Sequence, residues 1–387
     1  MSTQLAYLAR QVNAGNDYAG KHVTLTRNLN LDNREWTAIG TDHTYPFKGV
    51  FDGNNHVIYN LTINKPGNPY QGLFGYLDGA VIQKLGLENV NVRGQSNTGG
   101  VAGRLDGGGS IENCYSTGTV SGTFFCTGGV VGSVDGGSIA DSYSTGNVSG
   151  VSIVGGIAGE VDDNSSVSGS YSTGNVSGTS NVVGGVAGHV SNTSSIENCY
   201  STGNVSGTDG VGGVAGWVYS SSIADSYSTG NVSGTSYSVG GVVGSVDGGS
   251  IADSYSTGNV SGTGSDVGGV AGQVSDYLGG SSIEYCAALN PSVSAAGNAG
   301  RVVGSITGTG HIFTGNVAWD DMTVTGSTVT DNSQKDGAGR ANTAFHSAAG
   351  FPFTVNAAPS PWVYTPGTLP ILIGIAGQNS ALPAHLQ

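Results

Sequence analysis

Residues 198–207 read Asn-Cys-Tyr-Ser-Thr-Gly-Asn-Val-Ser-Gly, and closely similar stretches recur through the middle of the 387-residue chain. The Tyr-Ser-Thr-Gly core begins with tyrosine at positions 115, 143, 171, 200, 227 and 255, at spacings of 28, 28, 29, 27 and 28 residues. The copies lead into Gly-Gly-Val-Ala-Gly or a close variant. A fixed period of this length indicates a repeat architecture in which each copy forms one structural unit.

The segments inside one copy predict β-strands. They are short, rich in β-branched residues and separated by Gly, Asn and Asp, and in one copy they cover residues 186–190, 195–200 and 204–206. None of them reaches the length of about 10–12 residues that a helix needs. Three short strands in about 28 residues fit one coil of a solenoid better than a propeller blade of about 40–50 residues. The sequence therefore predicts an all-β fold, a parallel β-helix (β-solenoid).

Stacked coils would align equivalent residues in columns about 4.8 Å apart. Two apolar columns emerge, one of Val134, Val161, Val190, Val218, Val246 and Val274, the other of Ile111, Ile139, Val167, Ile196, Ile223, Ile251 and Ile283. The position before the Val column varies from Arg104 to Trp217, so we expect it to face outward and the Val column to face the core. Because side chains alternate between the two faces of a strand, a third apolar column should point outward and form an interface. The alternative is that its flanking glycines turn it inward as a second core row. Its members are Ala102, Val131, Ala158, Ala187, Ala215, Val243 and Ala271.

The two ends of the chain depart from the repeat. Leu5, Leu8 and Val12 have helical spacing, which predicts a short amphipathic helix within residues 3–14 that caps the first coils. Residues 294–387 break the period and are rich in proline. We therefore expect an N-terminal cap with the first coils over residues 1–69, a repeat solenoid over 70–293, and a C-terminal cap or irregular module over 294–387.

The charge distribution excludes several partners. The chain carries 12 Lys and Arg against 26 Asp and Glu, a net charge of −14. Between Asp106 and Gly300 there are fifteen acidic residues and no Lys or Arg. Binding of nucleic acid needs cations that neutralise phosphates, so neither nucleic acid nor an anionic membrane surface is an expected partner. No apolar run approaches the ~20 residues of a membrane span, so we expect no transmembrane segment.

Several stretches resemble the GLUG-motif repeat proteins of bacterial surfaces. The resemblance rests on Gly-Leu-Phe-Gly at residues 72–75, on the repeated Gly-Gly-Val-Ala-Gly and Asn-Cys-Tyr-Ser-Thr-Gly, on the preceding segments at 36–40, 47–54 and 60–63, and on the closing segments at 362–364 and 369–372. It implies a secreted or surface-anchored solenoid, a kind often found in adhesins, and it carries no catalytic residue to transfer. The start of the chain lacks the pattern of a signal peptide, so an extracellular location would imply a trimmed chain or a fragment.

Aromatic residues at positions that vary among the copies are candidate binding residues. An aromatic face beside polar groups suits a sugar or a protein partner, although single exposed aromatic residues are ordinary. The candidates are Phe124, Phe125, Trp217, Tyr219, Tyr237 and Tyr277. The regular column of tyrosines is instead expected to stack as part of the scaffold.

Acidic residues follow the Val column in several copies and form a candidate calcium site. Calcium takes six to eight oxygen ligands, so a row of carboxylates would suit it, although Asp-Gly is also ordinary turn chemistry. The candidate ligands are Asp106, Asp135, Asp162, Asp163 and Asp247. No cofactor is otherwise required. Cys114, Cys199 and Cys286 share one column at separations too long for a disulfide, and we expect them to be free and buried.

Three functions from different classes remain open. The first is a non-enzymatic extracellular adhesin or structural solenoid that binds a glycan, a surface protein or another copy of itself. The second is a β-helix polysaccharide lyase or glycoside hydrolase, which needs a distinct cluster of carboxylates. The third is an ice-binding solenoid, suggested by the column of Thr117, Thr145, Thr173, Thr202, Thr229 and Thr257.

Overall fold

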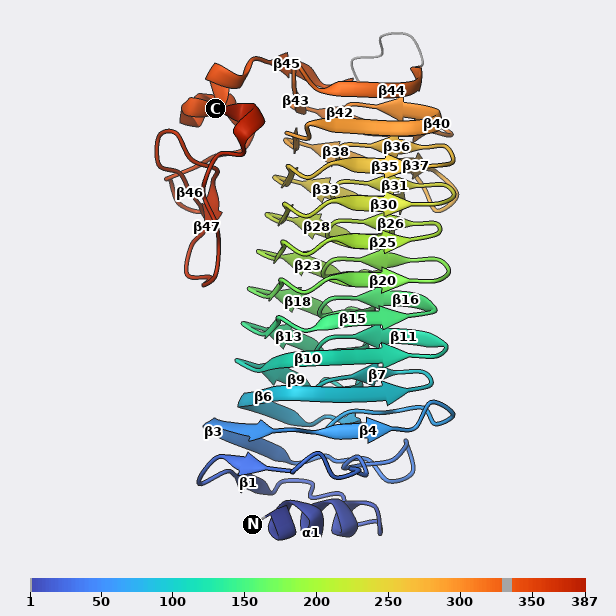
Figure 1. Cartoon of the computed structure of the whole chain (residues 1–387), viewed down its shortest axis with the longest axis vertical. Helices are drawn as coiled ribbons and strands as arrows, with labels where there is room; N and C mark the ends of the chain where they lie inside the picture. Colours follow the sequence, from blue (N-terminus) through green and yellow to red (C-terminus); the bar gives the residue numbers. More distant parts are fainter. Residues whose placement is uncertain (1, 329–335) are drawn as a thin grey trace. The chain divides into compact units, whose positions relative to one another are not determined.

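The computed structural model describes residues 2–328 and 336–387. The chain divides into two compact units, a first unit of Met1–Ser180 with Val186–Ser194 and a second unit of Asn181–Gly185 with Ser195–Gln387. Each unit consists of short parallel strands stacked coil upon coil (Figure 1). The predicted parallel β-solenoid is therefore confirmed in both units.

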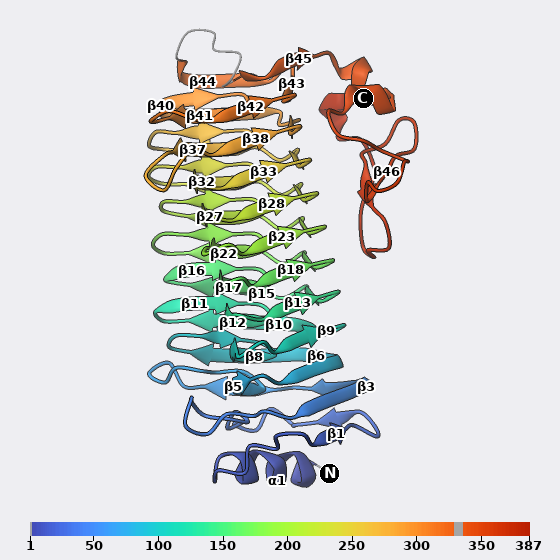
Figure 2. The ribbon, with the colours of Figure 1, turned by 180° about the vertical axis from the view of Figure 1, so that it is seen from behind.

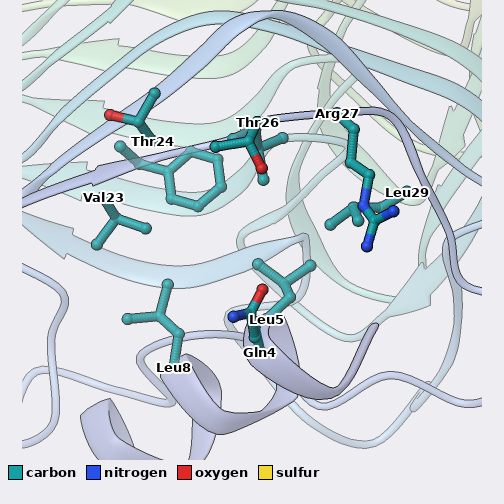
Figure 3. Close-up of a pocket in the computed structure, with 10 residues that line it drawn as sticks. Gln4, Leu5, Leu8, Val23, Thr24, Thr26, Arg27 and Leu29 are labelled. Carbon is teal, nitrogen blue, oxygen red and sulfur yellow. The ribbon is translucent and has the colours of Figure 1, made fainter. Parts of the chain in front are cut away.

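The first unit begins with the helix α1 (Ser2–Val12), which confirms the predicted capping helix. Its apolar side faces the coils, and Leu5, Leu8 and Val12 are at most 5% exposed. Figure 3 shows Leu5 and Leu8 pointing from α1 toward Val23 and Leu29 of the first coils. These side chains line a cavity of about 100 Å³ beneath the helix. The helix thus covers the apolar end that an uncapped solenoid would expose.

In the first unit, one sheet has a single strand from each coil, as Figure 2 shows. Its strands are β5 (Phe74–Asp78), β8 (Ala102–Asp106), β12 (Val131–Asp135), β17 (Ala158–Asp162) and β22 (Ala187–Val190). The other strands of this unit are β1 (His22–Thr24), β2 (Leu29–Asn30), β3 (Val50–Tyr59), β4 (Thr62–Asn64), β6 (Val81–Gly94), β7 (Thr98–Gly99), β9 (Ser110–Glu112), β10 (Tyr115–Gly122), β11 (Phe125–Gly128), β13 (Ser138–Ala140), β14 (Tyr143–Ser144), β15 (Asn147–Gly150), β16 (Ser152–Gly155), β18 (Ser166–Ser168), β19 (Tyr171–Ser172) and β20 (Val176–Gly178).

The second unit repeats this arrangement. Its single-strand sheet contains β27 (Ala215–Tyr219), β32 (Val243–Asp247), β37 (Ala271–Ser275) and β41 (Val303–Ile306). The other coil strands are β21 (Val183–Gly184), β23 (Ser195–Glu197), β24 (Tyr200–Ser201), β25 (Val205–Gly207), β26 (Val211–Gly212), β28 (Ser222–Ala224), β29 (Tyr227–Ser228), β30 (Val232–Gly234), β31 (Val239–Gly240), β33 (Ser250–Ala252), β34 (Tyr255–Ser256), β35 (Val260–Gly262), β36 (Val267–Gly268), β38 (Ser282–Glu284), β39 (Ala287–Ala288), β40 (Ser292–Gly300), β42 (Ile312–Thr314), β43 (Val317–Trp319), β44 (Thr323–Thr328) and β45 (Ala338–Arg340).

The register places like residues on top of one another. In the first unit Tyr115 pairs with Tyr143 and Tyr143 with Tyr171; in the second, Tyr200 pairs with Tyr227 and Tyr227 with Tyr255. Parallel pairing without a shift is what a nearly constant repeat length requires. The columns read from the sequence are therefore real columns within each unit.

The core lies between the sheets of each unit. Val134 and Ile139 in the first unit, and Val218 and Ile223 in the second, are 0% exposed, as predicted for the Val and Ile columns. The column of Ala102, Val131, Ala158, Ala187, Ala215, Val243 and Ala271 is also 0% exposed. The outward orientation expected from strand alternation is therefore wrong, and the alternative, that the flanking glycines turn this column into a second core row, is confirmed.

Glycine explains why both faces of that strand are covered. A Cβ atom on Gly132 would lie 2.4 Å from the carbonyl carbon of Asn97 and from the backbone nitrogen of Thr98. No side chain fits there, because the two backbone layers touch directly. The Gly-Gly-Val-Ala-Gly segment is therefore buried on both sides. The rule that side chains alternate between core and solvent applies to strands with one exposed face, and so it does not apply here.

Coil strands continue past residue 293, where the expected repeat region ended. The strands β40 to β45 pair in parallel with the strands before them. After Arg340 the chain leaves the coils and forms what we name the C-terminal segment, residues 342–387. It contains η1 (Asn342–His346), η2 (Ala348–Gly350), the antiparallel pair β46 (Trp362–Val363) and β47 (Ile371–Leu372), and η3 (Ala384–Leu386). Figure 1 shows it as a separate lobe beside the coils of the second unit.

Candidate functional site

The C-terminal segment lies on the tyrosine column of the second unit. Tyr200, Tyr227 and Tyr255 are 0% exposed, and their rings stack at 5.0 and 4.8 Å. Each hydroxyl donates to the C-terminal segment: Tyr200 to the Ala376 carbonyl oxygen (2.6 Å), Tyr227 to Gln378 Oε1 (3.1 Å), and Tyr255 to the Pro370 carbonyl oxygen (2.8 Å). The column is thus scaffold and docking surface at once.

Trp362 is the central side chain of this contact. It is 0% exposed, and its indole Nε1 donates to Asp225 Oδ1 at 2.9 Å. Its ring lies 5.5 Å from that of Tyr255 and 4.9 Å from that of Phe353. Aromatic burial together with a hydrogen bond to a carboxylate holds the segment in one position. Two hollows open on either side of the contact.

The larger hollow, about 460 Å³, is a groove between the coils and the end of the C-terminal segment. We name it the neutral groove. Its coil side presents hydroxyl and amide side chains, because every second residue after the tyrosine faces outward. Its lining residues are Thr229, Asn231, Thr257, Gly258, Asn259 and Pro291 from the coils, and Leu369, Asn379, Ala381, Leu382, Pro383 and His385 from the segment.

Hydrogen bonds between coils fix the amides of the neutral groove. Asn231 Oδ1 accepts from the backbone nitrogen of Asn259 at 3.0 Å and from its Nδ2 at 3.2 Å. Asn259 Oδ1 in turn accepts from Ser292 Oγ at 2.8 Å. These bonds orient the side chains before any ligand arrives, which lowers the entropy lost on binding.

His385 keeps the groove uncharged. Burial lowers the pKa of this imidazole, so it is neutral at physiological pH. Nε2 lies 2.7 Å from the Leu289 carbonyl oxygen. In the neutral ring Nε2 must then carry the proton, and Nδ1 is left as an acceptor. The groove thus combines hydroxyls, amides and one imidazole acceptor with the apolar surfaces of Leu369 and Leu382.

The smaller hollow, about 260 Å³, has an acidic floor, and we name it the acidic pocket. Asp225 and Asp253 lie in successive coils and face Phe353, Trp362 and Ser360 of the C-terminal segment. Burial, with the neighbouring charge of Asp253, raises the pKa of Asp225 to about 6, although the Trp362 hydrogen bond acts in the opposite direction. Burial also raises the pKa of Asp253, with help from the charge of Glu284. Burial thus leaves both carboxyl groups poorly solvated and favours their protonated forms.

The repeat pattern on which both hollows are built matches a known family model. The GLUG motif matches residues 94–121, 125–149, 179–206 and 235–261. The chain carries repeats of the GLUG motif. These matches cover strands from both units, and they include Tyr200 and Tyr255 of the tyrosine column but not Tyr227.

Curated relatives resemble parts of this chain. Halomucin of Haloquadratum walsbyi is 39% identical over 99 residues, which are 25% of this chain and 1% of the relative. The immunoglobulin A1 protease of Streptococcus pneumoniae is 31% identical over 123 residues, 31% of this chain and 6% of the relative. A solved IgA1 protease superposes with a TM-score of 0.46 at 19% identity, over 82% of this chain and 21% of the other. The chain thus spans only a small part of each of these three proteins.

The aromatic residues predicted from the sequence lie outside both hollows. In the first unit Phe124 and Phe125 are 49% and 42% exposed, with ring centroids 4.1 Å apart. In the second unit Trp217 and Tyr219 are half-buried on β27 in an edge-to-face contact at 5.8 Å. Tyr237 and Tyr277 are exposed. The structure thus places these six residues at several positions and does not gather them into one site.

Four of the five predicted calcium ligands contact other groups of the protein. Asp106 and Asp135 both contact Arg104, Asp162 accepts from Ser191 Oγ at 2.7 Å, and Asp247 accepts from the Leu278 backbone nitrogen at 2.9 Å. Asp163 is exposed at a turn with φ of 53°. Within residues 2–328 and 336–387 no three His, Cys, Asp or Glu side chains are grouped to hold a metal ion. Calcium binding stays a prediction.

Sequence reasoning did not find the neutral groove or the acidic pocket. Both depend on contacts between residues far apart, such as Asp225 and Trp362, which are 137 positions apart. The one available signal was the proline-rich aromatic ending of the chain, whose docking place the repeat does not reveal. Cys114, Cys199 and Cys286, by contrast, are free and buried as expected.

Proposed function

We propose that this chain is a non-enzymatic binding solenoid of a bacterial surface, an adhesin, that recognises an uncharged glycan in the neutral groove. The observation that carries the proposal is a groove of about 460 Å³ whose lining has hydroxyl, amide and apolar groups and no charged side chain. Ligand sites commonly have volumes of about 300–1,000 Å³ and a few polar groups that fix orientation.

The chemistry of the neutral groove matches that of a sugar ring. A sugar presents hydroxyl groups at its edge, which both donate and accept, and C–H groups on its faces. Asn231 and Asn259 offer amide donors and acceptors, Thr229 and Thr257 offer hydroxyls, and Leu382 offers an apolar wall. A charged ligand would find no counter-charge there.

Two observations support an extracellular location. The repeats are of the GLUG type, and the sequence resembles surface proteins that carry them. One relative is named for immunoglobulin A1, a secreted antibody. Separately, no helix in the described part of the chain is long and apolar enough to cross a membrane.

A glycan array with the full-length chain tests the proposal. We expect binding to neutral glycans, and we expect Asn259→Ala to weaken it at least about tenfold, since one good polar contact is worth about 1–1.5 kcal/mol. The matched control is Asn147→Ala, the same repeat position in the first unit, where the amide likewise accepts from the next coil at 3.0 Å. The proposal fails if no glycan binds, or if both variants weaken binding equally.

Thermal unfolding of the chain with and without calcium tests calcium binding. Calcium bound by the acidic row of Asp106, Asp135, Asp162, Asp163 and Asp247 would raise the melting temperature progressively as its concentration rises above the dissociation constant. An unchanged melting temperature at millimolar calcium would exclude a contribution of calcium to the fold.

The acidic pocket favours a second candidate, a glycoside hydrolase. Asp225 and Asp253 lie in adjacent coils, so their separation is close to the strand spacing of about 4.8 Å, near the 5–5.5 Å between the carboxyl groups of retaining enzymes. The pKa of about 6 for Asp225 suits a general acid. Release of reducing ends from a polysaccharide panel, abolished by Asp253→Asn, would establish this function in place of the adhesin.

A further inference from the structure

The tyrosine column of the second unit shows what kind of segment such a column binds. The contact uses four coil residues: Tyr200, Tyr227 and Tyr255 donate through their hydroxyls, and Asp225 accepts from the indole of Trp362. We name these four residues the second dock. The C-terminal segment supplies carbonyl and amide oxygens and aromatic rings.

The first unit carries the same four residues at the same repeat positions. Tyr115, Tyr143 and Tyr171 correspond to the three tyrosines, and Asp141 corresponds to Asp225. We name this set the first dock.

The geometry of the two docks agrees closely. The rings of the first dock stack at 4.8 Å with interplanar angles of 2° and 3°, against 5.0 and 4.8 Å with 8° and 4° in the second. Asp141 has φ of 48° and Asp225 has φ of 47°, and the backbone nitrogen of each donates to the next coil, at 3.1 and 3.2 Å. A segment that fits one dock therefore meets the same four side chains in the same arrangement on the other.

The two docks differ in how far they are covered. Tyr200, Tyr227 and Tyr255 are 0% exposed beneath the C-terminal segment, whereas Tyr115 and Tyr143 are only partly buried and Asp141 is exposed. The Tyr115 hydroxyl donates to Glu88 at 2.8 Å, at the surface of the same unit. Tyr143 and Asp141, which correspond to Tyr227 and Asp225, are accessible from solvent.

We propose that the first dock binds the C-terminal segment of a second copy of this chain. Trp362 of that copy donates to Asp141, and its aromatic rings pack beside Tyr143, as they do beside Tyr227 within one chain. The segment leaves its own second dock and forms equivalent contacts on its neighbour. The surfaces used by the two copies are different, so the contact is heterologous and can extend copy by copy.

The second dock of each chain competes with the first dock of another copy for the C-terminal segment. This competition sets the protein concentration at which copies associate. A tethered segment has an effective concentration of roughly millimolar at its own dock. The wild-type chain is therefore monomeric when dilute, and it associates as its concentration approaches that range. Releasing the segment from its own dock favours association.

Sedimentation velocity of the full chain over a concentration series tests the proposal with two matched variants. Tyr143→Arg blocks the first dock and should abolish association. Tyr227→Arg, the same position in the second unit, frees the segment and should lower the concentration for association about tenfold or more. Asp141→Lys, at an exposed position, provides a second block of the first dock that leaves the coils folded.

Mixing variants identifies the partners directly. The chain with Trp362→Ala lacks a competent segment but keeps its first dock, and the chain with Tyr143→Arg has the opposite defect. Neither should associate alone, and an equimolar mixture should form a one-to-one complex. The proposal is overturned if the wild-type chain stays monomeric at millimolar concentration, if Tyr143→Arg or Asp141→Lys still associates, or if the mixture remains monomeric.

Discussion

Replacing Trp362 with alanine should release the C-terminal segment while leaving the coils folded. Trp362 is fully buried against Tyr255 and Phe353, and Trp-to-Ala changes at such sites cost about 3–5 kcal/mol. The lost hydrogen bond to Asp225 adds about 1–2 kcal/mol, at the lower end for a charged group because water can reach this half-buried carboxylate.

A loss of free energy of this size exceeds what the remaining contacts of the C-terminal segment can offset. The segment has few other large buried side chains, chiefly Phe345, Phe351, Phe353 and Tyr364, and they pack mainly on one another and on Trp362. The coils have their own core of Val and Ile columns, which Trp362 does not enter. The change should therefore appear as local opening rather than global unfolding.

Hydrogen exchange measured by mass spectrometry is the suitable assay. We expect exchange to speed up by about a hundredfold or more in residues 342–387, with no change in β10 or β12 and no change in the far-UV spectrum. Trp217→Ala, on β27 of the same unit, is the control and should leave the segment protected. Unchanged exchange in the segment of the Trp362 variant would refute the role given to this side chain.

Three further changes test other parts of the structure. Because burial raises the pKa of Asp225 to about 6, docking should be strongest below about pH 4 and weaken as the pH rises through 6; exchange in the segment should follow that profile, and Asp225→Asn should flatten it. Gly132→Ala places a Cβ 2.4 Å from the backbone at Asn97 and should destabilise the first unit by about 1–3 kcal/mol or more in urea unfolding, whereas an alanine at the open Gly67 should have little effect. Ile139→Ala should cost about 2–5 kcal/mol and Ile139→Val only about 0.5–1.5; equal costs would contradict tight packing of the Ile column.

The repeat made the fold predictable because every coil has nearly the same length and the same pattern of apolar and turn residues. A near-constant spacing fixes the register, and the register fixes the columns, so the Val and Ile columns could be placed inside before the structure was known. The capping helix followed from the spacing of Leu5, Leu8 and Val12. These inferences need only local periodicity.

Strand parity failed for the column that contains Ala187 because parity assumes that one side of a strand faces solvent. The glycines of Gly-Gly-Val-Ala-Gly let a second backbone layer approach within contact distance, and both sides are then covered. The flanking glycines were the signal for the alternative, an inward second core row, which the structure confirms. A run of glycines that flanks a single small apolar residue indicates contact between backbone layers better than it indicates a turn.

The tyrosine column shows why the candidate site could not be read from the repeat. Tyr143 and Tyr227 have the same neighbours in sequence and the same pairing in their coils, yet one is half-buried and the other lies beneath the C-terminal segment. Their difference is set by residues such as Trp362 and Gln378, which lie outside the repeat and reach the column from more than a hundred positions away. In this architecture the coils supply identical docking positions, and the segment that occupies one of them decides where a groove forms. A GLUG solenoid with the same coils and a different closing segment should therefore keep its fold and lose its groove.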